Sequence, residues 1–280
     1  MSRPSEDAVM SRLRIVTYNV HRCLGVDGRL SPGRIAAVIA ETGADIVALQ
    51  ELDVRRARSG GIDQAEAIAR ELGMDNVHFH PALKVMEEEY GDAIITGLPS
   101  AVVKAGPLPG LERRPRIEPR GAIWARVEID GGPVDIINTH FGLRRWERRA
   151  QARCLLGPEW LGQADPAIPL VLAGDFNSFP HGTVCGLIRR HLRDAHRIGS
   201  PKRRRPRRTY PSGFPVFRID HIFVSRQFSV ESADTHRSVL SRAASDHLPL
   251  VADLVIDRLR DVRPVHADGV LATGPDRQGR

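Results

Sequence analysis

The stretch LVLAGDFNSFPHG, residues 170–182, begins with an apolar run and is then broken by a proline and a glycine. A short apolar run bounded by turn residues is typical of a buried β-strand, and we predict one over 170–175. This strand would end on the carboxylate of Asp175, and the carboxamide of Asn177 follows two residues later. Two polar side chains at the exit of a buried strand indicate a site at the rim of a sheet.

Polar residues mark the ends of other predicted strands as well. Three further strands would end on Asn19, Glu51 and His140. Two acid–histidine pairs stand at or near the starts of the last two predicted strands: Asp220 with His221, and Asp246 with His247. Strand ends lie at the edge of a sheet, so antiparallel pairing would bring these starts beside those exits. All of these groups would then share one cleft.

The remaining apolar runs complete a mixed α/β pattern. Strands are predicted over 13–19, 45–51, 92–96, 121–129, 134–140, 170–175, 217–225 and 248–256. Segments with a 3.6-residue apolar spacing predict helices over 31–43, 62–73 and 144–161. A turn sequence at 130–132 indicates a hairpin between two of the strands. Because helical crossovers and hairpins coexist, we expect mixed sheets with helices packed outside them.

We expect one folded domain over residues 13–257. With 41% apolar and 27% charged residues, the chain can bury a sizeable core. Residues 1–12 and 258–280 lack apolar periodicity, and we predict a flexible N-terminus and a flexible C-terminal tail. No apolar run has the length of a signal peptide or a membrane span, so a cytoplasmic location is expected. The three cysteines lack the spacing of a zinc site or a disulfide framework.

The net charge of +7 is concentrated in one segment. The run PKRRRPRR, residues 201–208, holds six basic residues, which leaves a net charge of +1 for the rest of the chain. Such a run is often a solvated loop, and it is equally suited to contact with an anionic surface of nucleic acid or lipid headgroups. The sequence leaves these alternatives open.

Carboxylates, carboxamides and imidazoles in one cleft suit a particular chemistry. Hard cations such as Mg²⁺ prefer oxygen ligands and need only one or two protein carboxylates. Imidazoles transfer protons near neutral pH or, when charged, donate a hydrogen bond to a phosphoryl oxygen. Each residue alone is more often a turn former or a helix cap. Their coincidence at six strand ends predicts metal-assisted hydrolysis of a phosphate ester.

Eight short motifs carry a resemblance to a known family. In chain order they are TYNV (17–20), LQE (49–51), YGDAIIT (90–96), PRG (119–121), NTHFG (138–142), GDFN (174–177), RIDHIFVS (218–225) and SDHLPLVADL (245–254). This set resembles the endonuclease/exonuclease/phosphatase superfamily, the DNase I-like metal-dependent phosphohydrolases. The resemblance implies an α/β fold, a four-layer α/β/β/α sandwich of two mixed sheets. It also implies Mg²⁺-dependent attack of water on phosphorus, with Mn²⁺ as a substitute.

The resemblance further implies roles for the residues of the cleft. Glu51 would be the principal metal carboxylate, with Asn19 and Asp246 close to the metal directly or through water. Asp175 and Asn177 would hold and activate the attacking water.

Other positions would contact the phosphate group. His247, oriented by Asp220, would polarise the scissile phosphate or act as the base, since family members have been read both ways. His140 would donate a hydrogen bond to a phosphate oxygen, and Arg120 would support that charge. Arg120, His140 and His247 are therefore the implied phosphate-binding residues.

Three positions depart from the family pattern. His21 stands where nucleases of the family often carry an acidic residue, which argues against a second metal contact there. Asp92 replaces the more usual Asn, a change that is either neutral or alters a water network. His221 is a less typical neighbour of Asp220, and we expect it to be structural.

We therefore expect an enzyme, a metal-dependent phosphoric ester hydrolase that acts on a lipid headgroup or a small phosphoester. A DNA endonuclease or exonuclease of the same superfamily is the alternative, because the arginine clusters could follow a phosphate backbone. A catalytically inactive phosphate-binding protein is the alternative of a different class, although none of the expected catalytic residues is missing. We expect a monomer, with the choice between lipid headgroup, small ester and nucleic acid left open.

Overall fold

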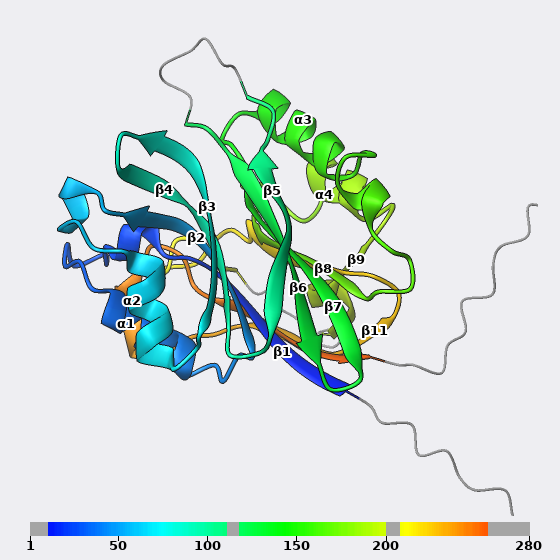
Figure 1. Ribbon diagram of the computed structural model, residues 1–280, viewed down its shortest axis with the longest axis horizontal. Coiled ribbons are helices and arrows are strands. Elements are labelled where there is room, and N and C mark those ends of the chain that lie inside the picture. The colour runs from blue at the N-terminus through cyan, green and yellow to red at the C-terminus, as the bar shows by residue number, and fades with distance from the viewer. Residues whose placement is uncertain (1–10, 111–117, 200–207, 257–280) are drawn as a thin grey trace, which may run out of the picture.

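The computed structural model (Figure 1) describes residues 11–110, 118–199 and 208–256. The predicted C-terminal tail, the first ten residues and most of the basic run at 201–208 lie outside these ranges. The first strand begins at Ser11, so residues 11 and 12 belong to the sheet and not to the predicted flexible N-terminus. None of the helices in the described ranges has the length and apolar character needed to cross a membrane.

Two mixed sheets of six strands each form the centre of the molecule. The first has the order β11 (Phe228–Thr235), β12 (Leu250–Ile256), β1 (Ser11–Asn19), β2 (Ile46–Val54), β4 (Glu88–Thr96), β3 (Asn76–Val85). The second has the order β5 (Ser100–Pro107), β6 (Gly121–Ile129), β7 (Gly132–His140), β8 (Leu170–Asp175), β10 (Asp220–Val224), β9 (Arg193–Asp194). Only β1–β2 and β7–β8 are parallel among these paired strands.

Helices cover the outer faces of both sheets. The described helices are α1 (Pro32–Ala40), α2 (Gln64–Leu72), α3 (Arg145–Leu155), α4 (Thr183–Ile188), α5 (Ala195–Gly199) and α6 (Val239–Ala244), with 3₁₀ turns at His21–Cys23, Ala57–Ser59 and Leu161–Gln163. Helices α1 and α2 pack on the first sheet, and α3 and α4 on the second (Figure 1). The expected four-layer α/β/β/α sandwich of two mixed sheets is confirmed.

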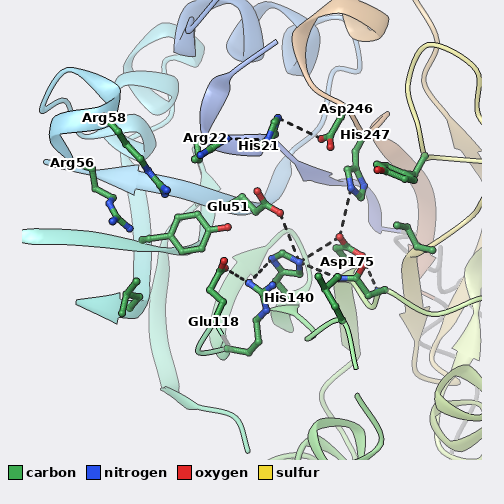
Figure 2. Close-up of a pocket in the computed structure, with 17 residues that line it drawn as sticks. His21, Arg22, Glu51, Arg56, Arg58, Glu118, His140, Asp175, Asp246 and His247 are labelled. Atoms are coloured by element: carbon green, nitrogen blue, oxygen red, sulfur yellow. Dashed lines mark hydrogen bonds and ion pairs between the residues drawn. The ribbon is translucent and has the colours of Figure 1, made fainter. Parts of the chain in front are cut away.

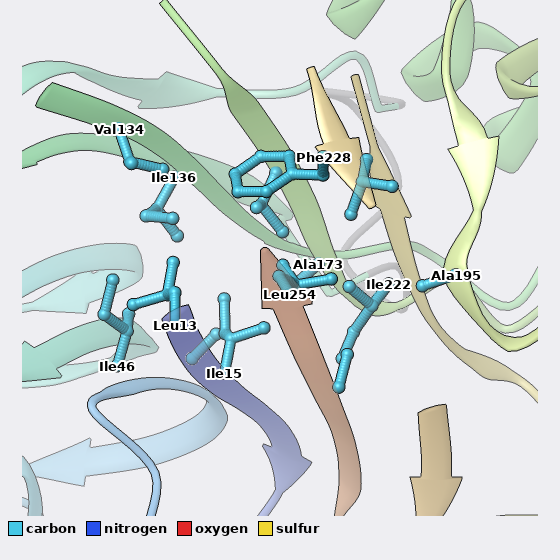
Figure 3. Packing of buried hydrophobic residues seen from close by; sticks show 14 of the residues in the cluster. Leu13, Ile15, Ile46, Val134, Ile136, Ala173, Ala195, Ile222, Phe228 and Leu254 are labelled. Carbon is cyan, nitrogen blue, oxygen red and sulfur yellow. The ribbon is translucent and has the colours of Figure 1, made fainter. Parts of the chain in front are cut away.

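The alternation of side chains along the strands divides the interior into separate layers. In β1, Ile15 lies in the cluster between the sheets, whereas Val16 lies in the cluster under α1 and α2. In β8, Ala173 faces the other sheet and Leu172 faces the α3–α4 side. Figure 3 shows this central layer, where residues from strands far apart in the chain meet. Strands buried on both faces explain the continuous apolar runs in the sequence.

The strand predictions succeed in the interior of the sheets and fail at their edges. All eight predicted strands are present, and they are the eight inner strands of the two sheets. The four strands that the sequence did not reveal, β3, β5, β9 and β11, are the four edge strands. An edge strand has an exposed side and needs no long apolar run, and β3 even contains Pro81. The helix predicted over 144–161 is shorter than expected and ends at Leu155.

The corner after β8 is fixed by backbone contact and by an aromatic anchor. Gly174 has φ +146°, and a Cβ there would lie 1.9 Å from the carbonyl oxygen of Thr139, so only glycine fits. Phe176 is fully buried, and its ring centroid lies 5.0 Å from that of Phe141 and 5.4 Å from that of Phe223. The residue between Asp175 and Asn177 therefore points into the core and holds the corner in place.

We predict that Phe176→Ala lowers the free energy of unfolding by about 3–5 kcal/mol, because it leaves a cavity among well-packed rings. Urea denaturation followed by circular dichroism measures this change. The matched control is Phe214→Ala, since Phe214 is 78% exposed and its replacement should change stability by less than about 0.5 kcal/mol. Equal effects of the two variants would show that Phe176 does not anchor the corner.

Candidate active site

One cavity of about 570 Å³ opens at the edge where the polar strand ends meet (Figure 2). Its lining includes seven of the residues expected to function: Glu51, Arg120, His140, Asp175, Asn177, Asp246 and His247. The other two, Asn19 and Asp220, are buried directly behind the lining and hydrogen-bond to it. The structure thus brings all nine residues together.

Strand register explains why these side chains meet. The parallel pair β7–β8 sets His140 opposite Asp175, and the antiparallel pair β8–β10 sets Asp220 opposite the same Asp175. In the facing sheet, the parallel pair β1–β2 sets Asn19 opposite Gln50, next to Glu51. His140 at the end of β7, Asp175 at the end of β8 and Asp220 at the start of β10 therefore lie at a common edge. The loop before β12 adds Asp246 and His247.

The backbone is left-handed at two of the functional positions. Glu51 has φ +64° and lies where the β2–β4 register shifts between Leu49 and Leu52, so a bulge turns its carboxylate into the cavity. Asn177 has φ +46° at the corner after β8. Such conformations are rare for residues other than glycine and persist only where the surrounding structure enforces them.

Asn19 joins two carboxylates at the centre of the site. Its Nδ2 donates to Glu51 Oε1 at 2.9 Å and to Asp175 Oδ2 at 3.1 Å. Its Oδ1 accepts from the backbone N–H of His21 at 3.0 Å. In this arrangement the carboxamide oxygen is engaged by the backbone, and Asn19 positions the two acids rather than presenting an oxygen to the cavity.

His247 and Asp220 form a buried ion pair. His247 Nδ1 lies 3.0 Å from Asp220 Oδ2 and 3.2 Å from Oδ1, and the opposite nitrogen lies 3.7 Å from Asp175 Oδ2. Burial lowers the pKa of His247, but the charges of Asp220 and Asp175 outweigh it and raise this pKa to about 10. The imidazole is therefore charged at neutral pH, with Nε2–H directed toward Asp175.

His140 has the opposite character. Burial, Arg120 and His247 hold its pKa well below the ordinary value, so the ring is neutral. Arg120 Nη1 approaches Nδ1 at 3.4 Å and the amide Nδ2 of Asn177 approaches Nε2 at 3.2 Å, so each ring nitrogen faces a group that donates. Nε2 also lies 3.5 Å from Asp175 Oδ2 and 3.9 Å from Glu51 Oε1. A neutral and a cationic imidazole therefore lie against the same carboxylate, that of Asp175.

Asp175 is the carboxylate on which these contacts converge. Burial and the neighbouring charge of Asp220 raise its pKa to about 7. Its Oδ1 accepts from the backbone N–H of Asn177 at 2.8 Å, while the Nδ2 of Asn177 donates to the carbonyl of Phe141 at 2.9 Å. A carboxylate with a pKa near neutrality can take up and release a proton under ordinary conditions.

The acids of the site fit a divalent cation. Two sets of side chains could serve as its ligands. Asp175, Asp220 and His247 offer ligand atoms within 4.8 Å of one another, but Asp220 is fully buried and already engaged by His247. The Glu51 carboxylate is about one-fifth exposed and faces the cavity, with Asp246 on the same lining. Oxygen donors that remain open to the cavity suit a hard cation better than a closed ion pair does.

His21, which departs from the family pattern, lines the cavity with a positive φ. Several other residues of the cavity were missed in the sequence. They include Arg22, also with positive φ, and Tyr210, whose ring centroid lies 4.8 Å from that of His247. The far wall adds the polar side chains of Arg56, Arg58 and Glu118 (Figure 2), and Tyr90 also lines the cavity. Arg58 is held by a two-point ion pair with Asp53 at 2.7 and 2.9 Å. The basic run that follows Glu51 in the sequence was the available signal for this wall.

Two departures from the family pattern have a structural explanation. His221 is fully buried behind the site and lies 2.8 Å from the carbonyl oxygen of Ser178, away from the cavity. Asp92 is also buried, and burial raises its pKa to about 8 despite the opposing charge of Arg120. A protonated Asp92 is a neutral group near the Glu51 amide, as an asparagine would be.

Two facing mixed sheets with this cleft at one edge define a DNase I-like α/β protein. Residues 16–247 match the model of the Endonuclease/Exonuclease/phosphatase family, and the chain belongs to that family. Members of this family are generally hydrolases that act on phosphoesters.

The chain is also similar to one curated protein and to solved structures with the same fold. The uncharacterized protein YbhP of Escherichia coli strain K12 is 27% identical over 260 residues, covering 86% of this chain and 95% of YbhP. An endonuclease/exonuclease/phosphatase from Beutenbergia cavernae superposes with a TM-score of 0.69 at 24% identity, covering 88% of this chain and 72% of the other. The mannosyl-6-phosphatase Bt3783 of Bacteroides thetaiotaomicron gives 0.68 at 23% identity, covering 87% and 100%.

We predict that Asp92→Asn removes a pH dependence of stability. An unfolded Asp releases its proton near pH 3.9, whereas folded Asp92 keeps it to about pH 8. The wild-type free energy of unfolding therefore falls as pH rises between these values, by at most ~1.4 kcal/mol per unit from this group. Urea titrations in EDTA at pH 5 and 7.5 measure this effect. The free energy of unfolding of Asp92→Asn, relative to that of the wild type, should be higher at pH 7.5 than at pH 5. Parallel behaviour, like that expected of the exposed control Asp75→Asn, would contradict the buried protonated form.

Proposed function

We propose that this protein is a Mg²⁺-dependent hydrolase of phosphate esters that acts on a lipid headgroup or a small phosphoester. The observation that supports it is the convergence of Glu51, Asp175, His140 and His247 on one cavity, joined through Asn19. No simpler role accounts for two carboxylates, one neutral histidine and one charged histidine at the same edge. An ordinary turn or cap would need only one of them.

The cation would be held by residues with oxygens open to the cavity. Glu51 and Asp246 are the carboxylates that fit this role, and Asp175 lies within reach of the same amide as Glu51. A bound Mg²⁺ supplies positive charge that offsets the negative charge of the phosphate group. Mn²⁺, which has similar ligand preferences, should replace it.

Asp175 has the properties of the group that accepts a proton from the attacking water. Its pKa of about 7 lets it start as a carboxylate and end as an acid. Asn19 and the Asn177 backbone hold its two oxygens, so the carboxylate has a fixed orientation. Orientation of this kind converts an encounter with water into a positioned attack.

The two histidines would hold the phosphate group. His247 is charged and carries a proton on Nε2, which favours polarisation of the phosphate over service as the base. The neutral ring of His140 lies between Arg120 and the Asn177 amide, and in the tautomer with its proton on Nε2 it would donate to a phosphate oxygen. Hydrogen-bond donors placed where negative charge develops are an effective way to stabilise the transition state.

Two observations bear on the substrate class. The fold is shared with a structure described as a mannosyl-6-phosphatase, a hydrolase of a small phosphoester by name. A DNA nuclease remains the second candidate, because Arg22, Arg56 and Arg58 line the cavity and would suit a longer polyanion. These two candidates predict different products from the same catalytic groups.

A hydrolysis panel tests the proposal. The substrates are bis-p-nitrophenyl phosphate, phospholipid vesicles, plasmid DNA and a duplex with an abasic site, each with Mg²⁺ and with EDTA. We expect Mg²⁺-dependent release of p-nitrophenol or headgroup, and EDTA should abolish it. Nicked plasmid with inert lipid would favour the nuclease, and inertness toward every substrate would favour the binding protein.

We predict that Asp175→Asn lowers kcat on the preferred substrate by about 10²–10⁴-fold, because the variant cannot accept the proton. His247→Ala should be similarly impaired. The matched control is Asp130→Asn, at an exposed turn, which should retain wild-type kcat. Thermal unfolding of each variant verifies that the fold is intact. Wild-type turnover by Asp175→Asn would eliminate Asp175 as the base.

A further inference from the structure

A second cavity of about 190 Å³ adjoins the catalytic one. It lies between helix α3 and the chain that leads from β8 into α4, elements that are neighbours in Figure 1. Its polar lining includes Arg145, Arg148, Arg149 and Thr183. Asn177 lines both cavities, so the second cavity is a direct neighbour of the first.

The three arginines form an unusual group. They stand at positions i, i+3 and i+4 of α3 and therefore share one face of the helix. Three other arginines of this protein that are at least half-buried form ion pairs: Arg58 with Asp53, Arg126 with Asp135 and Arg218 with Asp194. In the described part of the chain, no carboxylate lies within 4.0 Å of the guanidinium groups of the α3 trio.

Keeping these cations together is unfavourable without an anion. Like charges three or four residues apart destabilise a helix. Burial lowers the pKa of Arg148, the charges of Glu147 and Asp175 oppose this shift, and the nearby Arg145 adds to it. The Nε atoms of Arg148 and Arg149 are buried and lack a hydrogen-bond partner among the described residues. Arg148 Nη1 donates to the carbonyl of Leu143, which satisfies one donor but neutralises no charge. An anion would satisfy both the charge and the free donors.

The remaining wall of the cavity adds a flat apolar surface. Phe179 is 54% exposed, and its ring centroid lies 5.3 Å from that of Phe217. Arginines beside an exposed aromatic pair suit an anionic group carried on an apolar or planar body. The α3 arginines thus combine buried donors with an enclosing wall, beside an exposed aromatic ring.

We propose that this cavity is a second phosphate-binding site and that the substrate carries two phosphate groups. This inference rests on the proposed function, since the scissile phosphate would occupy the catalytic cleft. The second phosphate would contact Arg145, Arg148 and Arg149 and is not cleaved. The chemistry is common to a bisphosphorylated nucleotide and to a lipid with a phosphorylated headgroup.

Matched substrates that differ by one phosphate test the proposal. The soluble pair is thymidine 3′-phosphate 5′-(p-nitrophenyl phosphate) and thymidine 5′-(p-nitrophenyl phosphate). The lipid pair is phosphatidylinositol 4-phosphate and phosphatidylinositol in vesicles. In at least one pair, the doubly phosphorylated member should have a kcat/KM at least about tenfold higher, as expected for charge-assisted hydrogen bonds. The pair that shows the preference identifies the source of the phosphate.

Variants of α3 separate this site from general effects of charge. Arg149→Gln should reduce the preference to about twofold or less, and Arg145→Gln, at an exposed position, should act in the same direction. Arg153→Gln is the matched control, because Arg153 is exposed on the same helix outside the cavity, and it should keep the wild-type preference.

A binding measurement distinguishes failure of this site from failure of the proposed function. Calorimetry in EDTA should show that thymidine 3′,5′-bisphosphate binds wild type about tenfold tighter than thymidine 5′-phosphate, and that Arg149→Gln loses this difference. A protein that hydrolyses none of the esters but retains the binding preference would refute the enzymatic proposal alone. The second site would be overturned if both members of every substrate pair had the same kcat/KM and the two thymidine phosphates bound with the same affinity.

Discussion

The structure depends on how it accommodates the buried carboxylate of Asp175. This side chain is fully enclosed, lies opposite Asp220 across a strand pair, and shares an amide with Glu51. Three acids so close together repel one another in a medium of low dielectric. Charged His247 offsets part of the repulsion, and the amide nitrogen of Asn19 donates hydrogen bonds to both Glu51 and Asp175. The charge left over is what makes the site suited to a cation.

The fold supplies this arrangement through strand register more than through loops. Two parallel strand pairs, one in each sheet, bring polar exits to the same edge, and neighbouring antiparallel strands add their starts. Gly174 and Phe176 fix the corner after β8, while a bulge directs Glu51 inward. Functional groups on packed strands are held more firmly than groups on loops. The left-handed residues of the site are the local strain that this rigid frame sustains.

The sequence predicted the inner strands and the polar groups that gather in the cleft, because both leave local patterns. Doubly buried strands need apolar runs, and acids at their exits stand out from those runs. Edge strands such as β3 and β5 carry no such pattern and were missed. Three further features were not predicted: the orientation of Asn19, the different charge states of His140 and His247, and the cavity beside α3. Each of these depends on which distant side chains come into contact, and spacing along one chain does not encode that.

Binding of a divalent cation in the cleft at the shared strand edge can be measured by anomalous diffraction from crystals grown with Mn²⁺. We expect one strong anomalous peak within coordination distance of the Glu51 carboxylate, and its loss in crystals of Glu51→Gln. A cleft without a peak at millimolar Mn²⁺, or a peak that persists unchanged in Glu51→Gln, would show that Glu51 holds no cation there.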